Sequence, residues 1–180
     1  MIKNTYHAYG HLTKILHWMM AIAFIVMFGI AYIMTNIDKS GFRDALYDFH
    51  KATGILLFIL AICRLVWRSV NVNPTLPDTI CTWQRQAAKY NIILLYLVMF
   101  FMPVTGFLTS TLGGHPISFY SVIVLAPLAE DPAVSLFFSN AHEIISYLFI
   151  AAFSMHVLGS LYHHYFLKDG LLRRMWASTP

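Results

Sequence analysis

The chain has 180 residues, of which 58% are hydrophobic and 11% charged, and its formal net charge is +4. This composition excludes an ordinary soluble domain, and the length suffices for only about four membrane spans of twenty-odd residues each. We therefore expect one integral membrane domain over residues 1–180 that is surrounded by lipid and has no nucleic-acid partner; the two cysteines indicate neither a disulfide framework nor a thiolate metal site.

Four long apolar segments follow one another along the chain, at about 13–35, 46–69, 88–112 and 139–167. The first is longer than the apolar part of a signal peptide and is not followed by a cleavage site, so we expect it to be retained. Pro103 in the third segment predicts a kink. Because the connections are short, neighbouring helices should be antiparallel. The predicted fold is an all-α, integral membrane four-helix bundle.

The distribution of basic residues predicts how the chain is oriented in the membrane. Lys and Arg gather near both termini and around the connection between the second and third segments, whereas the long connection at 113–138 contains neither. By the positive-inside rule both termini lie on the cytoplasmic side. We expect the apolar connection at 113–138 to lie along the outer interface or to fold back over the bundle.

Apart from His163 and His164 near the end of the fourth segment, four histidines lie inside these apolar segments. His142 and His156 are fourteen residues apart in the fourth segment, so an α-helix places them on the same face, about 21 Å apart. Counted from the outer surface, His50 in the second segment lies at the depth of His142, and His17 in the first lies at the depth of His156. The sequence thus predicts two facing pairs, His50 with His142 near the outside and His17 with His156 near the inside.

Two facing imidazoles fill both axial positions of a haem iron, which favours electron transfer over oxygen binding. We therefore predict two b-type haems, with the four histidines as the axial ligands of the iron. Gly54 and Gly159 lie within about one turn of His50 and His156 and leave room for a flat macrocycle. Arg64, fourteen residues after His50, is expected to pair with propionates of the inner haem. The alternative is an arginine that extends to the inner interface.

Other interpretations of the four histidines belong to different classes of protein. In an ordinary bundle such histidines form interhelical hydrogen bonds, and a metal transporter also uses intramembrane histidines. Ionisable residues inside a membrane are costly, however, and four of them at matched depths favour a functional role. A transporter would more naturally gather its ligands with carboxylates at one midplane site, whereas the carboxylates here lie near the segment ends. A membrane protein without a redox role would be colourless when purified.

Four motifs carry a resemblance to a known family. They are His-Trp at 17–18, His-Lys-Ala-Thr-Gly at 50–54, Ala-His-Glu at 141–143, and His-His-Tyr-Phe-Leu-Lys-Asp at 163–169, followed by Leu-Leu-Arg-Arg-Met. Together they resemble the bacterial cytochrome b561 family over nearly the whole chain, and within that family the superoxide oxidase type.

The resemblance implies an oxidoreductase of the bacterial inner (cytoplasmic) membrane. Such an enzyme takes electrons from superoxide at the outer, periplasmic face and passes them through two b haems to ubiquinone near the cytoplasmic face. The alternative is a cytochrome b subunit that links a partner dehydrogenase or hydrogenase to the quinone pool, since such subunits share the wider fold.

Each end of this electron path has candidate residues. His163 lies seven residues after His156, so it keeps the haem-facing side near the inner interface, where a histidine is suited to exchange protons with a quinone. The alternative is a histidine that contacts lipid head groups. Near the outer end, Lys39, Arg43 and Lys51 are expected to steer anionic superoxide. Because three aspartates lie among them, the alternative is an ordinary solvated loop.

Overall fold

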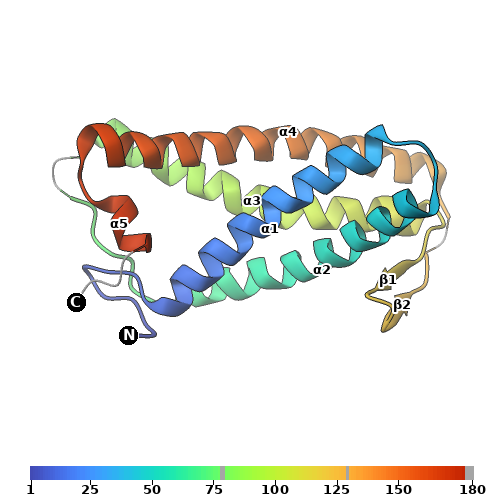
Figure 1. The fold of residues 1–180 in the computed structure, drawn as a ribbon, viewed down its shortest axis with the longest axis horizontal. Coiled ribbons are helices and arrows are strands. Elements are labelled where there is room, and N and C mark those ends of the chain that lie inside the picture. The colour runs from blue at the N-terminus through green and yellow to red at the C-terminus, as the bar shows by residue number, and fades with distance from the viewer. Residues whose placement is uncertain (78–79, 129, 177–180) are drawn as a thin grey trace.

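The computed structural model describes residues 1–77, 80–128 and 130–176. Four long helices run along the molecule: α1 (His11–Asn36), α2 (Gly41–Ser69), α3 (Thr82–Leu112) and α4 (Pro132–Tyr162) (Figure 1). Each is part of a helical segment long and apolar enough to cross a membrane. The prediction of a helical fold with four candidate spans is therefore confirmed.

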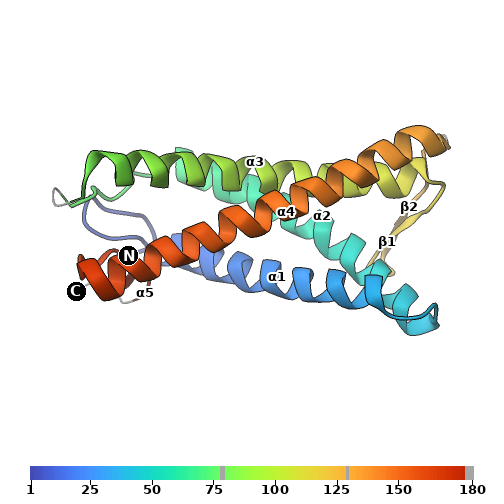
Figure 2. The same cartoon turned by 90° about the horizontal axis from the view of Figure 1, so that it is seen from above.

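The bundle has two different ends (Figure 1). The N-terminus and the short helix α5 (Leu171–Trp176) lie at one end, named here the terminal end. The connection between α1 and α2 and a β-hairpin of β1 (Ile117–Phe119) and β2 (Ile123–Leu125) lie at the other, the hairpin end. A π-helical turn, η1 (His163–Leu167), follows α4 and precedes α5. α1 crosses the bundle obliquely in Figure 1, and α4 does so in Figure 2.

Three helices begin five to seven residues before the predicted apolar segments, at Gly41, Thr82 and Pro132. Polar residues outside the segments cap two of them, since the side chains of Ser40 and Asp131 accept hydrogen bonds from backbone N–H groups in the first turns of α2 and α4. The earlier starts place His50 and His142 farther along their helices than expected, by a similar amount. His50 is nine residues after the start of α2, and His142 is ten residues after the start of α4.

The hairpin folds back onto α2, which is one of the two arrangements expected for the 113–138 connection. Its strands pair in antiparallel register, and the three-residue loop between them contains Tyr120 and Ser121, whose φ of 49° and 61° are the left-handed backbone found in tight hairpin turns. The Tyr120 hydroxyl lies 2.9 Å from Thr53 Oγ1 on α2, and Ile117 is fully buried. The hairpin therefore covers α2 one turn beyond His50.

The core is concentrated halfway along the bundle. Phe149, which is 1% exposed, packs its ring against Phe24 and Phe28 of α1 at centroid distances of 4.7 and 5.3 Å. Phe149 lies seven residues from both His142 and His156, and Phe24 lies seven residues after His17. An apolar layer thus separates the hairpin-end histidines from the terminal-end histidines.

We predict that Phe149→Ala destabilises the bundle, because removal of the ring leaves a cavity in this layer. The expected loss is about 3 kcal/mol or more of unfolding free energy, observed as a lower melting temperature of the detergent-purified protein. Phe137→Ala on the same helix is the matched control, since Phe137 is 65% exposed. Equal melting temperatures for the two variants would contradict the assignment of the core.

Candidate functional site: two histidine pairs across the bundle

The first pair joins His17 of α1 to His156 of α4. Their ring centroids are 6.0 Å apart and their planes are inclined by 60°. A bond from a metal to an imidazole nitrogen is about 2 Å long. With the radius of each ring added, two imidazoles on opposite sides of one metal ion have centroids separated by about 6 Å. The observed separation therefore fits one iron atom between the two rings.

The second pair consists of His50 on α2 and His142 on α4, which are close enough to interact electrostatically. His50 Nδ1 is buried and has no hydrogen-bond partner among the described residues. A buried polar atom without a partner is costly and needs an explanation. This one indicates a group near His50 that the chain itself does not supply.

Helix α3 holds the ring of His142. The Nδ1 atom lies 2.9 Å from the Met102 carbonyl oxygen and 3.1 Å from Thr105 Oγ1. Because a carbonyl only accepts, Nδ1 carries the proton and donates it, which leaves the Nε2 lone pair free. A Cβ atom at Gly106 would lie 3.0 Å from His142 Cε1, so a larger residue there would push the ring away from α3.

The sequence analysis placed no candidate site residue in α3, and these three residues were not anticipated. The available signal was the pair Thr105-Gly106 inside an apolar helix, because small residues mark close helix–helix contacts in membranes. α3 and α4 do pack closely along their length.

Arg64 on α2 reaches the terminal-end pair, with Nη2 2.9 Å from His17 Nδ1. An arginine only donates, so Nδ1 accepts here and a neutral His17 carries its proton on Nε2. Ligation of a metal through Nε2 therefore requires Arg64 to release His17 and take another acceptor. The sequence analysis expected Arg64 to lie at the depth of the pair formed by His17 and His156, and Arg64 contacts His17 of that pair.

The distance of α4 from α1 and α2 is the last feature of the site. Within the described ranges, backbones approach closely between α3 and α4, α1 and α2, and α2 and α3, whereas α4 is not packed in this way against α1 or α2. Those are the helix pairs that carry the facing histidines. A Cβ atom at Gly54 or Gly159 would meet no other atom within 4 Å. Donor type and room thus fit a flat metal-containing group between each pair, and the ring spacing fits it at the pair of His17 and His156.

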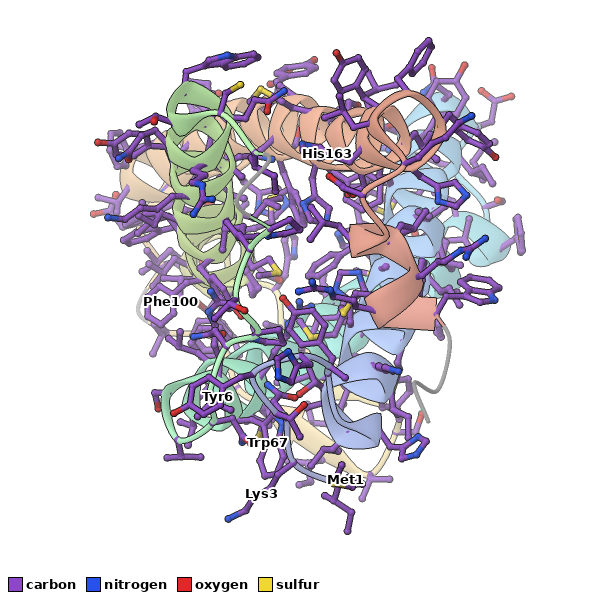
Figure 3. The ribbon with its side chains drawn as sticks, turned by 90° about the vertical axis from the view of Figure 1, so that its left-hand side faces the viewer. Met1, Lys3, Tyr6, Trp67, Phe100 and His163 are labelled. Atoms are coloured by element: carbon purple, nitrogen blue, oxygen red, sulfur yellow. The ribbon has the colours of Figure 1, made fainter. Side chains whose placement is uncertain are left out.

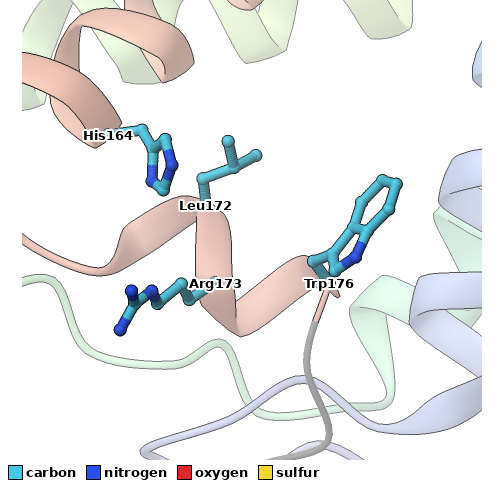
Figure 4. Close-up of a pocket in the computed structure, with 4 residues that line it drawn as sticks. All are labelled: His164, Leu172, Arg173 and Trp176. Carbon is cyan, nitrogen blue, oxygen red and sulfur yellow. The ribbon is translucent and has the colours of Figure 1, made fainter.

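At the terminal end, His163 is held by Asp169, with Nδ1 2.5 Å from Oδ2. His163 lies on the side of α4 that faces the bundle interior (Figure 3). His164 instead lines a cavity of about 480 Å³ together with Leu172, Arg173 and Trp176 (Figure 4). The sequence assigned the quinone role to His163 and gave no role to His164. η1 replaces the regular α-helix at this point, so a count of 100° per residue no longer fixes the directions of the two rings.

The cavity adjoins the terminal-end pair through two tryptophans. Trp176 packs edge to face on Trp18 at 5.1 Å, and Trp18 lies 5.3 Å from the ring of His17. The Trp18 indole also donates to the Met175 carbonyl oxygen. Neither the cavity nor the docking of α5 was predicted from the sequence.

The three predicted steering cations lie at the hairpin end. Lys39 is in the connection between α1 and α2, and Arg43 and Lys51 are on α2. Arg43 lies over the ring of Tyr47 at 5.5 Å. Among residues 1–77, 80–128 and 130–176, none of the three cations forms an ion pair with a carboxylate. Lys51 directly follows His50, so it brings positive charge next to the second histidine pair.

Comparison with known proteins assigns this arrangement to a family. The family model described as prokaryotic cytochrome b561 matches residues 8–178. Cytochrome b561 homolog 2 of Escherichia coli (strain K12) is 31% identical over 174 residues, which are 96% of this chain and 93% of the relative. Cytochrome b561 homolog 1 of the same organism is 29% identical over 131 residues, 71% of this chain and 73% of the relative. The chain therefore belongs to the prokaryotic cytochrome b561 family, whose members are membrane cytochromes that bind haem b and transfer electrons.

Proposed function

We propose that the chain binds two haem b groups and is a superoxide:ubiquinone oxidoreductase of the bacterial inner membrane. His50 and His142 ligate one iron, and His17 and His156 ligate the other. Two superoxide anions each give up one electron at the hairpin end and leave as dioxygen. One quinone at the terminal end takes the two electrons and two protons and becomes quinol.

The observation that carries this proposal is the division of the four intramembrane histidines into two pairs, one toward each end of the bundle. His142 and His156 are fourteen residues apart on α4, which corresponds to about 21 Å of helix. Haem iron with two axial imidazoles changes its charge by one electron without binding a new ligand. A pair toward each surface therefore supports transfer across the membrane, whereas a single central site would not.

Basic residues support an orientation with the terminal end in the cytoplasm. The described basic residues of that end lie in the N-terminal segment and on or next to α1, α2, α3 and α5, and they include Lys3, Lys14, Arg68, Arg85, Lys89, Lys168, Arg173 and Arg174. The hairpin itself contains no lysine or arginine. The positive-inside rule then places the hairpin end in the periplasm, where superoxide would arrive.

Three chain residues have defined roles in this proposal. Arg64 leaves His17 and pairs with a propionate, since a carboxylate is a stronger partner for guanidinium than a neutral ring nitrogen. His163 exchanges a proton with the quinone. Lys51, which has no carboxylate partner among the described residues, attracts the anionic donor toward His50. The cavity beside His164 provides a volume in the range of small-molecule sites.

We predict that replacement of one histidine removes one haem and leaves the other. His142→Ala and His17→Ala should each lower the haem content from two per chain to one, measured by pyridine haemochromogen absorbance against protein concentration. His115→Ala is the control, because His115 is an exposed histidine outside the four helices. Two haems per chain in both ligand variants would contradict the assignment.

Superoxide should reduce the oxidised protein directly. In a stopped-flow mixture with a superoxide source, the b-type absorbance of the reduced state should appear rapidly, and an added ubiquinone analogue should reverse it. Superoxide dismutase in the mixture should abolish the reduction. Protein that dithionite reduces but superoxide does not would instead favour a subunit fed by a partner dehydrogenase or hydrogenase.

The three hairpin-end cations should control the rate of this reduction. Replacement of Lys39, Arg43 and Lys51 together by Gln is expected to slow reduction by superoxide about tenfold at low ionic strength and to remove most of its salt dependence. Lys89→Gln, at an exposed position near the start of α3, is the matched control. If both proteins show the same rate and the same salt dependence, the cations have no steering role.

A further inference from the structure

The backbone after α4 has an unusual form that brings Asp169 back to His163. In a continuous α-helix, six residues turn 600°, which would place Asp169 about 240° away from His163. Here η1 widens the helix, and Lys168 has a left-handed φ of 53°. Both π-helical turns and left-handed non-glycine residues are uncommon and unfavourable. The chain adopts both, and together they allow the two side chains to meet.

The contact between the two side chains is short and sheltered. Asp169 Oδ2 lies 2.5 Å from His163 Nδ1, and the side chains are 5% and 17% exposed. The other carboxylate oxygen, Oδ1, accepts the Leu171 N–H at 3.1 Å and so caps the first turn of α5. Because a carboxylate accepts, His163 donates from Nδ1. Its Nε2 atom is then left to exchange protons.

We infer that Asp169 is a positioning residue for quinone reduction: it fixes the proton of His163 on Nδ1 and directs Nε2 to the quinone. This inference rests on the proposed function. For each quinone converted to quinol, two electrons come from superoxide and two protons from water at the terminal end. His163 first takes one of these protons from water on Nε2, which gives a doubly protonated ring, and then delivers it from Nε2 to a quinone oxygen and returns to the neutral ring with its proton on Nδ1. Asp169 neither gains nor loses a proton in this cycle.

The same contact could also serve only to attach α5 to the end of α4. Asp169→Asn separates these two roles. Its amide oxygen still caps α5, but its NH₂ group now faces His163 and donates, so Nδ1 must accept and the proton moves to Nε2. Asp131→Asn is the matched control, because Asp131 likewise caps a helix, α4, and its carboxylate accepts only backbone N–H groups.

The first measurement does not depend on activity. In reduced protein labelled with ¹⁵N-histidine, the ring nitrogen signals of His163, assigned by their loss in His163→Gln, should report a proton on Nδ1. Asp169→Asn should shift the proton to Nε2, and Asp131→Asn should not. A neutral His163 ring that carries its proton on Nε2 in the unmodified protein would overturn the inference whatever the quinone reaction shows.

The second measurement is the reoxidation of reduced protein by a ubiquinone analogue. Asp169→Asn should lower the maximum rate at least about tenfold, with haem content and the apparent KM for quinone unchanged. It should have no further effect in a His163→Gln background, and Asp169→Glu should restore much of the rate. A raised KM with an additive effect in the double variant would instead show that Asp169 only attaches α5. If quinone does not reoxidise the unmodified protein, the proposed function fails independently of the tautomer result.

Discussion

The facing of imidazoles across helices whose backbones do not approach each other closely is the constraint on which the rest of this structure depends. α4 carries one histidine of each pair, and its partners on α1 and α2 lie on helices that it does not approach backbone to backbone. Helices whose backbones lie far apart in a membrane make fewer van der Waals contacts, which are the main attraction available there. The gaps are therefore tolerable only where another group fills them, and haem b is the group that the family binds.

The two pairs are prepared for ligation in different ways. At the hairpin end, the Met102 carbonyl oxygen takes the Nδ1 proton of His142 and leaves Nε2 free in advance. At the terminal end, Arg64 occupies His17 Nδ1 and must move before Nε2 can ligate. The aromatic layer around Phe149 keeps the two pairs apart. We therefore expect the hairpin-end site to form with less rearrangement than the terminal-end site.

Periodicity and hydropathy alone were enough to predict the helical fold and which histidines face each other. Those features depend on residues within one helix and on depth in the membrane, both of which sequence spacing encodes. The sequence analysis also expected His17 and His156 to lie equally many residues from the same surface, and this was less accurate. His17 lies nineteen residues from the end of α1, whereas His156 lies twenty-four from the start of α4. The oblique course of α1 and the capped extension of α4 beyond its apolar segment both contribute to that difference.

Contacts that depend on a change in backbone form or on another helix could not be predicted in this way. Asp169 reaches His163 only through a π-helical turn and a left-handed lysine, and neither has a clear signature in residue types. Likewise, the support that Met102 gives to His142 comes from a carbonyl oxygen, which every residue has. These contacts also decide which ring nitrogen of His163 and of His142 carries the proton. The chemistry of the site therefore depends on contacts that the spacing of residues in the sequence does not reveal.

Near-infrared magnetic circular dichroism of the oxidised, purified protein tests the ligation most directly, because it distinguishes bis-imidazole haem from other axial ligand sets. The account predicts that all the haem, two groups per chain, shows low-spin bis-imidazole ligation. A high-spin component or a methionine ligand that accounts for half of the haem or more would contradict it.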